Sequence, residues 1–241
     1  METTSQQKAE LLLEETRSDF EQFAYVVSHD LQEQVRNITN YTGLIEKHPK
    51  FSDDEEIRFY MGVVTGSANK LNEQLAELLT YSRIGRNKKK ETISIRKVLG
   101  DVIMDMEAEV AGRQAKIYIG DMPEVNGNTS EMKILFQNLL NNSLKFSGSL
   151  PPEITINCQN KNKAWEFSIK DNGIGIVENH LHKIFTMFQR LNPEEEYPGN
   201  GAGLAICKKI ISWHNGKIWA ESEPGKGSVF YFTLPTMELP A

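Results

Sequence analysis

The chain has 241 residues and a formal net charge of −6, with 27 basic against 33 acidic side chains. This length suits one large domain or two modest ones, and the acidic balance argues against a nucleic-acid partner. The two cysteines form no CxxC pair and no apolar run reaches the roughly 18 residues that cross a bilayer, so no disulfide framework, zinc site or membrane segment is predicted, and a reducing cytoplasm is the expected location.

A long amphipathic helix is predicted over about residues 6–47, where Gly43 is the only glycine and proline is absent. Residues 1–19, which include the first part of this helix, are interpreted as an N-terminal coiled-coil extension. Beyond it, apolar residues recur in alternating steps of four and three, which is the seam of a helical bundle. The seam comprises Phe20, Ala24, Val27, Leu31, Ile38 and Ile45, with Gln34 and Tyr41 filling the remaining positions.

His29 is predicted to lie outside this seam. It is two residues from both Val27 and Leu31, and at about 100° per residue it points about 200° away from each of them. An exposed imidazole beside the carboxylate of Asp30 is a candidate nucleophile. The alternative is a surface histidine without a chemical role.

A second helix is predicted after Pro49, because Ser52-Asp53-Asp54-Glu55 has the spacing of a capping box. Residues 20–85 are therefore predicted to form an antiparallel helical hairpin. Two hairpins would bury their apolar stripes by pairing into a four-helix bundle, so a homodimer is expected. The alternative is a single hairpin that leans on the second domain. The apolar stripe of the second helix comprises Ile57, Met61, Val64, Ala68, Leu71, Leu75, Leu78 and Ser82.

A polar, basic linker is predicted at residues 86–92, followed by an α+β domain at 93–241. Its pattern predicts an α/β sandwich in which helices cover one face of a mixed sheet. Strands are predicted at 93–95, 116–119, 124–125, 153–158, 164–170, 216–221 and 228–234, and helices at about 96–111, 129–148 and 203–214.

Asn138, Asn142 and Lys145 share one face of the helix predicted at 129–148, because they are spaced by four and three residues. Asn142 is a candidate ligand of Mg²⁺, which takes few protein oxygens besides water and phosphate. Lys145 is a candidate phosphate contact. The alternative is a solvated polar helix face.

Two glycine-containing motifs follow. Asp171 ends a predicted strand and opens the sequence DNGIGI, where its carboxylate is placed to accept a hydrogen bond from an exocyclic amine such as that of adenine. An ordinary capped turn is the alternative. The sequence GNGAGL at 199–204 precedes a helix, and its backbone N–H groups are candidates to hold phosphate.

Residues 177–198 lie between these motifs and contain Phe185, Phe188 and Arg190. We interpret this segment as a mobile lid anchored by its aromatic side chains, with Arg190 able to reach a terminal phosphate. An amphipathic helix followed by a loop is the alternative, and the two interpretations are compatible.

The order of these features, an exposed histidine helix, an asparagine-rich helix, DxGxG, a phenylalanine-containing segment and GxGxG, resembles the sensor histidine kinases of two-component signalling. The resemblance covers about residues 20–235, and FAYVVSHDLQE at 23–33 is similar to the subgroup of phytochrome-type and related bacterial kinases. It implies a dimerisation and histidine-phosphotransfer hairpin joined to an ATP-binding α/β sandwich. It also implies a response-regulator receiver domain as partner and a sensor module upstream.

The resemblance further implies roles for individual residues. His29 would accept the γ-phosphoryl group of ATP, and Asp30 would orient and deprotonate its imidazole. Glu33 is a second candidate for that task, because residues four apart on a helix face each other. Asn142 would bind Mg²⁺ and Asn138 would position the reacting groups. Nucleotide contacts are implied for Asn142, Lys145, Asp171, Gly173, Gly175, Phe188, Arg190, Gly199, Gly201, Gly203 and Leu204.

Four residues depart from the family pattern. Gln34 stands where proline is usual, so a straighter first helix is predicted. Glu33 stands where many members carry the Thr or Asn that serves dephosphorylation of the regulator, so phosphatase activity is less expected than kinase activity. Asn200 and Ala202 replace a Thr and a larger aliphatic residue, which predicts weakened ATP binding.

Two other functions stay open from the sequence. ATP-hydrolysing enzymes of the same superfamily, such as DNA gyrase and mismatch-repair ATPases, carry a glutamate base where this chain has Asn138. A catalytically weak, dimeric nucleotide-binding scaffold is the second alternative, and it would be favoured by Gln34, Asn200 and Ala202.

Overall fold

The chain divides into two compact units, Met1–Arg83 and Ile84–Ala241. The first is a helical hairpin and the second is an α+β domain, which confirms the predicted fold class. None of the helices described here is long and apolar enough to cross a membrane. The computed structural model describes residues 31–32, 35–47, 54–86, 90–191, 196–197 and 199–236.

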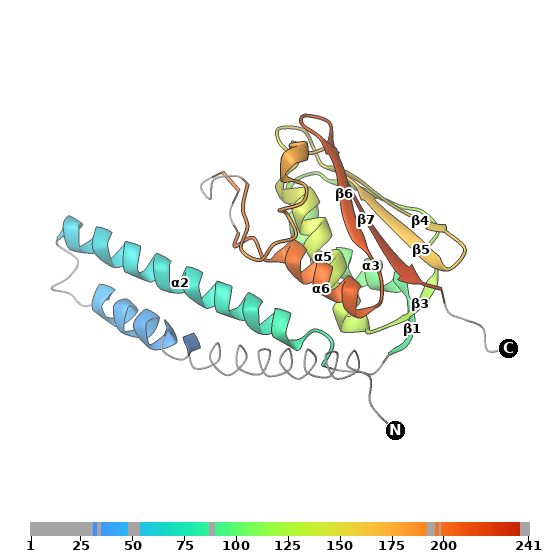
Figure 1. The fold of residues 1–241 in the computed structure, drawn as a ribbon. Helices are drawn as coiled ribbons and strands as arrows, with labels where there is room; N and C mark the ends of the chain where they lie inside the picture. Colours follow the sequence, from blue (N-terminus) through green and yellow to red (C-terminus); the bar gives the residue numbers. More distant parts are fainter. Residues whose placement is uncertain are drawn as a thin grey trace, which may run out of the picture. The chain divides into compact units, whose positions relative to one another are not determined.

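The hairpin combines a helix described over residues 35–46 with the longer helix α2 (Glu55–Arg83) (Figure 1). Asp54 caps α2, because its Oδ1 accepts hydrogen bonds from the backbone N–H groups of Glu56 and Ile57 at 3.0 and 3.2 Å. Ser52, the expected first residue of a capping box, lies outside the described residues.

The hairpin buries only part of the predicted seam. Val35, which the heptad pattern omits, packs with Ala68 and Leu75. Two helices alone offer each other a narrow contact, so much of the wider apolar stripe stays open to solvent. The exposed apolar residues are Leu31, Ile38, Tyr41, Leu44 and Ile45 on the first helix, and Phe59, Tyr60, Val63, Val64 and Leu71 on α2.

A five-stranded mixed sheet organises the second unit, with the strand order β2-β4-β5-β7-β6. β2 and β4 run parallel, and the other neighbours run antiparallel. A separate antiparallel pair joins β1 (Glu91–Ser94) to β3 (Glu124–Gly127). The strands of the large sheet are β2 (Lys116–Ile119), β4 (Glu153–Asn160), β5 (Ala164–Lys170), β6 (Ile218–Glu223) and β7 (Gly227–Pro235).

Helices cover one face of this sheet, as predicted (Figure 1). Phe136 of the central helix packs with Phe167 and Phe232 of the sheet, and all three side chains are fully buried. Such aromatic pairs add about 0.5–1.5 kcal/mol each beyond their burial. The helices are α3 (Ile95–Asp105), α4 (Glu107–Gly112), α5 (Thr129–Lys145) and α6 (Gly203–Trp213), with a short 3-10 helix, η1 (Glu178–His180).

Two predicted element boundaries are wrong. The helix expected over 96–111 is split into α3 and α4, because Met106 leaves the helical region with φ −102° and ψ 12° while its side chain stays buried. Ile95, expected to end a strand, begins α3 instead. The side chain of Ser94 explains this start, since its oxygen accepts the backbone N–H of Lys97.

Candidate functional site

The polar side of α5 forms one wall of the candidate site. The opposite side of this helix is buried in the core, which leaves Asn138, Asn142 and Lys145 half-buried along one face. Asn138 is held by a hydrogen bond of 2.8 Å from its Nδ2 to the carbonyl of Ile134. The side chain of Asn142 makes no hydrogen bond to another described residue. Its amide oxygen is therefore available to a ligand.

Asp171 lies at the end of β5 with only 7% of its surface exposed. Its Oδ1 accepts two backbone N–H groups, from Gly173 at 2.9 Å and from Ser228 at 3.0 Å. Burial raises the pKa of this carboxyl, and the two hydrogen bonds act in the opposite direction. Both bonds use Oδ1, so within the described residues Oδ2 is left for a donor group on a ligand.

The turn after Asp171 contacts two other elements, the end of α5 and the end of β6. Ile174 donates its backbone N–H to the carbonyl of Phe146, just beyond α5, at 2.9 Å. Gly175 has φ +71°, and a Cβ there would collide with the backbone of Glu223 at the end of β6. Only glycine meets both demands. The second glycine of DxGxG is therefore needed because the backbone of β6 passes too close to leave room for a side chain.

The glycine loop, residues 199–204, lies against the polar face of α5. A Cβ on Gly203, the first residue of α6, would lie 2.5 Å from the amide oxygen of Asn138. A Cβ on Gly199 would lie 3.0 Å from Nζ of Lys145. The loop thus brings the N-terminus of α6 to the polar face of α5, where backbone N–H groups and a cation converge. Gly201 belongs to the same loop, and Leu204 is half-buried in the first turn of α6.

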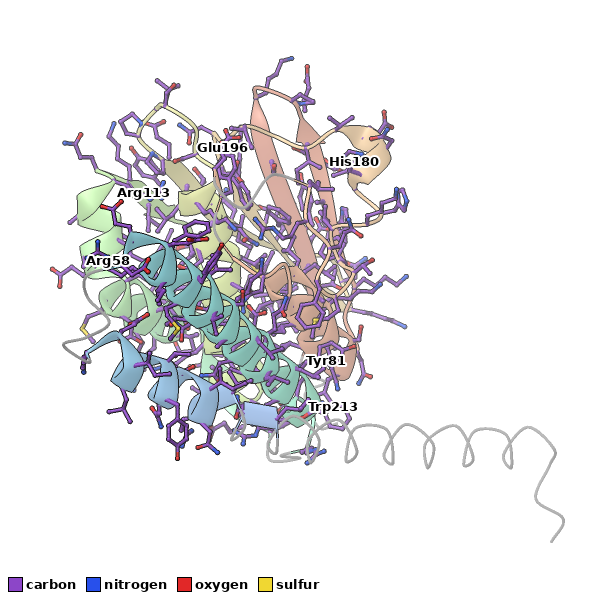
Figure 2. All side chains as sticks on the ribbon, turned by 90° about the vertical axis from the view of Figure 1, so that its left-hand side faces the viewer. Arg58, Tyr81, Arg113, His180, Glu196 and Trp213 are labelled. Carbon is purple, nitrogen blue, oxygen red and sulfur yellow. The ribbon has the colours of Figure 1, made fainter. Side chains whose placement is uncertain are left out.

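The segment between the two motifs begins with η1, on which Figure 2 labels His180. Further along the segment, Ile184 is buried, Phe185 is half-buried and Phe188 is 40% exposed. Arg190 donates a hydrogen bond of 3.1 Å to the carbonyl of Tyr197.

Tyr197 packs against Phe146, with ring centroids 5.0 Å apart. The segment is therefore pinned where α5 ends.

Three contributors to this site were missed from the sequence. Ser228 supplies a backbone donor to Asp171, and Ser222 holds the same turn by accepting the N–H of Ile176 at 2.8 Å. The side chain of Asn172 bridges Pro151 and Glu153, which fixes the start of β4. The glycines around Ser228 were a visible turn signal, but nothing in the sequence shows that this turn meets Asp171.

Four residues named from the sequence, His29, Asp30, Glu33 and Gln34, lie outside the described residues. Their geometry, and the straighter helix expected from Gln34, stay predictions.

Comparison with known families matches residues 127–238 to the histidine kinase-, DNA gyrase B- and HSP90-like ATPases. The phytochrome-like protein Cph1 of Synechocystis is 37% identical over 92% of this chain and 30% of its own length. The methanogenesis regulatory histidine kinase FilI of Methanothrix harundinacea is 32% identical over 93% of this chain and 25% of its own. The chain therefore spans less than a third of these curated relatives.

Two solved structures show the same fold. The full-length structure of ShkA in complex with AMPPNP aligns with a TM-score of 0.67 at 19% identity, over 91% of this chain and 47% of its own. The catalytic domain of histidine kinase ThkA aligns with a TM-score of 0.54 at 25% identity, over 62% of this chain and 99% of its own. The first alignment includes both units, and the second covers a catalytic domain alone.

Proposed function

The chain belongs to the sensor histidine kinases of two-component signalling, as a catalytic core with an ATP-binding domain, and on that premise we propose that it transfers the γ-phosphoryl group of ATP to His29 and then to an aspartate of a response regulator. The observation that carries this proposal is the meeting of the polar face of α5 with the glycine loop, where Asn138 lies against Gly203 and Lys145 lies against Gly199, with Asn142 on the same face of the helix. A cation, an amide oxygen and backbone N–H groups on one wall suit a metal-bound polyphosphate.

The residues present fit an adenine nucleotide. Asp171 has an oxygen left for the exocyclic amine of adenine, and its two backbone hydrogen bonds fix its orientation. Asn142 would supply one oxygen to Mg²⁺, whose charge would offset that of the phosphates. Lys145 and Arg190 would contact the phosphates, and Asn138 would position the reacting groups against Gly203. Gly173, Gly175, Gly199 and Gly201, with Phe188 and Leu204, would line the nucleotide.

The proposed chemistry needs little covalent help from the ATP-binding unit. A bond forms between an imidazole nitrogen of His29 and the γ-phosphorus, while the bond from that phosphorus to the bridging oxygen breaks and ADP leaves. His29 must present a lone pair, so its ring has to be oriented and relieved of a proton. Asp30 is the proposed residue for this task, with Glu33 as the second candidate.

Dimerisation through the hairpin is supported by the apolar surface that one chain leaves open. Tyr41 and Phe59 are 68% and 67% exposed, and Ile38 is 48% exposed. Exposed apolar side chains along both helices indicate a surface that is covered in the assembled protein. We infer a homodimeric four-helix bundle, with the receiver domain of a response regulator as the phosphoryl acceptor.

Incubation of the chain with γ-labelled ATP and Mg²⁺ tests the proposal. We expect label that is stable to base, is lost in acid and is absent from His29→Gln. Asn142→Ala should also remove the label, because nucleotide and metal would no longer be held together. Stable ATP binding without label would favour the nucleotide-binding scaffold, and release of phosphate without label would favour the ATP-hydrolysing alternative.

A further inference from the structure

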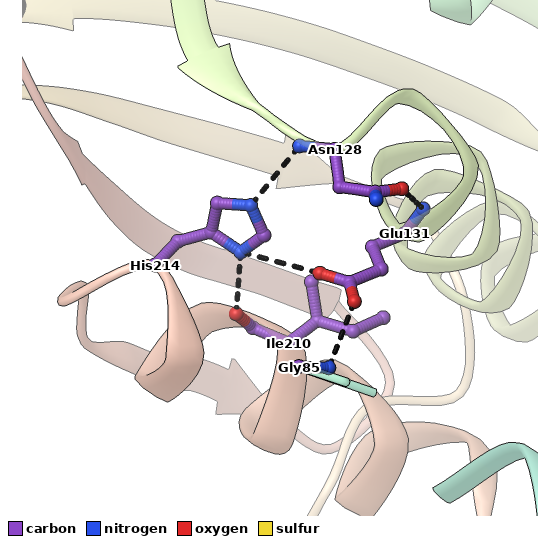
Figure 3. Close-up of polar contacts among 5 residues, drawn as sticks. All are labelled: Gly85, Asn128, Glu131, Ile210 and His214. Carbon is purple, nitrogen blue, oxygen red and sulfur yellow. Dashed lines mark hydrogen bonds and ion pairs between the residues drawn. The ribbon is translucent and has the colours of Figure 1, made fainter. Parts of the chain in front are cut away.

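We propose that Glu131 and Trp213 form a clamp that fixes the first residues of the ATP-binding unit, 84–86, onto its own body, and that both act as positioning residues for the transfer to His29. The inference rests on the proposed function. It concerns a contact remote from the nucleotide-binding residues, at the point where the chain passes from α2 into the second unit (Figure 3).

The clamp begins with an incomplete capping box at the start of α5. Asn128 caps the helix, since its Oδ1 accepts the N–H of Glu131 at 3.2 Å. In a complete box the glutamate would accept the backbone N–H of the capping residue in return. Here His214 takes that N–H instead, with its Nε2 at 3.3 Å from the nitrogen of Asn128. The carboxylate of Glu131 is thereby released from its ordinary local partner.

The hydrogen bonds of His214 define which ring nitrogen carries the proton. Nδ1 lies 2.8 Å from the carbonyl of Ile210, so it donates, and Nε2 accepts from Asn128. Burial lowers the pKa of His214, which favours this neutral form, although the neighbouring carbonyl of Ile210 and carboxylate of Glu131 act against that shift. A neutral ring is required, because a protonated Nε2 could not accept the N–H of Asn128 and the two donors would repel each other.

The carboxylate of Glu131 is turned toward the first residues of the unit instead. Its Oε1 accepts the backbone N–H of Gly85 at 2.9 Å. The residue is 6% exposed, and its Oε2 has no hydrogen-bond partner among the described residues, with Nδ1 of His214 at 3.8 Å. A buried carboxylate with so few partners is unfavourable where only packing is needed. Its one outward hydrogen bond joins α5 to residue 85, and this points to a holding role.

Trp213 closes the clamp from the end of α6, where Figure 2 labels it. Gly85 has φ +84°, and a Cβ there would lie 2.6 to 3.0 Å from three atoms of the Trp213 indole. The indole therefore covers the α-carbon of Gly85 at a distance that admits only glycine. Ile84, the preceding residue, is 4% exposed. The segment is held by α5 and α6 together.

The clamp shortens the tether, which is the stretch of chain between α2 and the body of the ATP-binding unit. With the clamp closed, the segment held on the ATP-binding unit begins at Ile84, directly after α2 ends at Arg83. With it open, residues 84–90 could extend by about 23 Å before β1. A longer tether lowers the effective concentration of the ATP site at His29. The clamp would thus raise the rate of transfer and leave ATP binding unchanged.

The test opens the clamp from either side and compares it with a matched control. Glu131→Ala removes the acceptor, Gly85→Pro removes the donor and forbids φ +84°, and Glu131→Gln keeps an acceptor oxygen for Gly85. We expect the autophosphorylation rate at saturating ATP to fall on the order of three- to tenfold in Glu131→Ala and Gly85→Pro. The ATP dissociation constant should not change, and Glu131→Gln should stay near wild type.

Amide hydrogen exchange gives a readout that does not depend on catalysis. The Gly85 amide should be protected in the wild-type chain and in Glu131→Gln, and should lose protection in Glu131→Ala while the amides of α5 keep theirs. A fast-exchanging Gly85 in the wild type, or open-clamp variants with an unchanged or higher rate, would overturn the clamp. A wild-type chain that takes up no label would instead contradict the proposed function, and the exchange measurement would still decide whether the clamp holds.

Discussion

The carboxylate of Asp171 holds a turn of the fold, and in the proposed site it also binds the base. Oδ1 holds the turn through the N–H groups of Gly173 and Ser228, and Oδ2 is left for the ligand. Because burial raises the pKa of this carboxyl, the ionised form is destabilised by its surroundings. The folded chain tolerates it since the two backbone donors offset part of that penalty. A substitution that keeps the acceptor and removes the charge should therefore separate the two tasks.

Asp171→Asn is that substitution. Its amide oxygen still accepts from Gly173 and Ser228, so we expect the free energy of unfolding to hold or rise, while ATP affinity falls at least about tenfold through loss of one charge-assisted hydrogen bond. Asp171→Ala leaves both donors unpaired and should also cost about 1–3 kcal/mol of stability. Calorimetric ATP titration and urea unfolding measure the two effects, and wild-type affinity in Asp171→Asn would exclude a role in binding the base.

At the scale of elements, the contact between Tyr197 and Phe146 fixes the segment that follows DxGxG across the end of α5. Lys145 reinforces this junction, with its Nζ 4.7 Å from the centroid of the Phe146 ring. A segment already pinned at this point loses less freedom when a nucleotide binds, so part of the ordering cost is met in advance. The ring contact should therefore contribute to ATP affinity.

Tyr197→Ala removes this contact, whereas Tyr197→Phe keeps the ring. Aromatic pairs of this kind contribute about 0.5–1.5 kcal/mol, so we expect the KM for ATP to rise about two- to tenfold in Tyr197→Ala and to stay near wild type in Tyr197→Phe. The rate of labelling as a function of ATP concentration measures KM. A KM that rises equally in both variants would assign the effect to the hydroxyl group rather than to the ring contact.

Elements with a strong local signal could be predicted from the sequence, and contacts between distant residues could not. The helical period places Asn138, Asn142 and Lys145 on one side of α5, as the structure shows. The break at Met106 was missed because its side chain fits the apolar pattern of a continuous helix. The bond from Asn128 to His214 joins residues 86 apart, and no local periodicity encodes a partner at that distance.

For the whole molecule, the two units differ in how far the sequence of one chain predicts them. The ATP-binding unit holds the residues of the proposed site on a buried core, so motifs were enough to name these residues, and their role in binding nucleotide stays a prediction. The hairpin instead leaves many apolar residues exposed, and its core within one chain is small. We therefore expect the stability of the hairpin to depend on the second copy inferred above, which a heptad pattern suggests but cannot place.

A charge in the exposed seam should therefore disrupt the dimer. Ile38→Lys places an ammonium where we infer an apolar contact, and loss of about 1.5 kcal/mol or more per chain, twice in a symmetric interface, weakens association about a hundredfold or more. Asn40→Lys is the matched control, since Asn40 lies about 200° from Ile38 on the same exposed helix. Sedimentation equilibrium should give a monomer for Ile38→Lys and a dimer for Asn40→Lys. A dimer of unchanged affinity in Ile38→Lys would place the interface elsewhere on the hairpin.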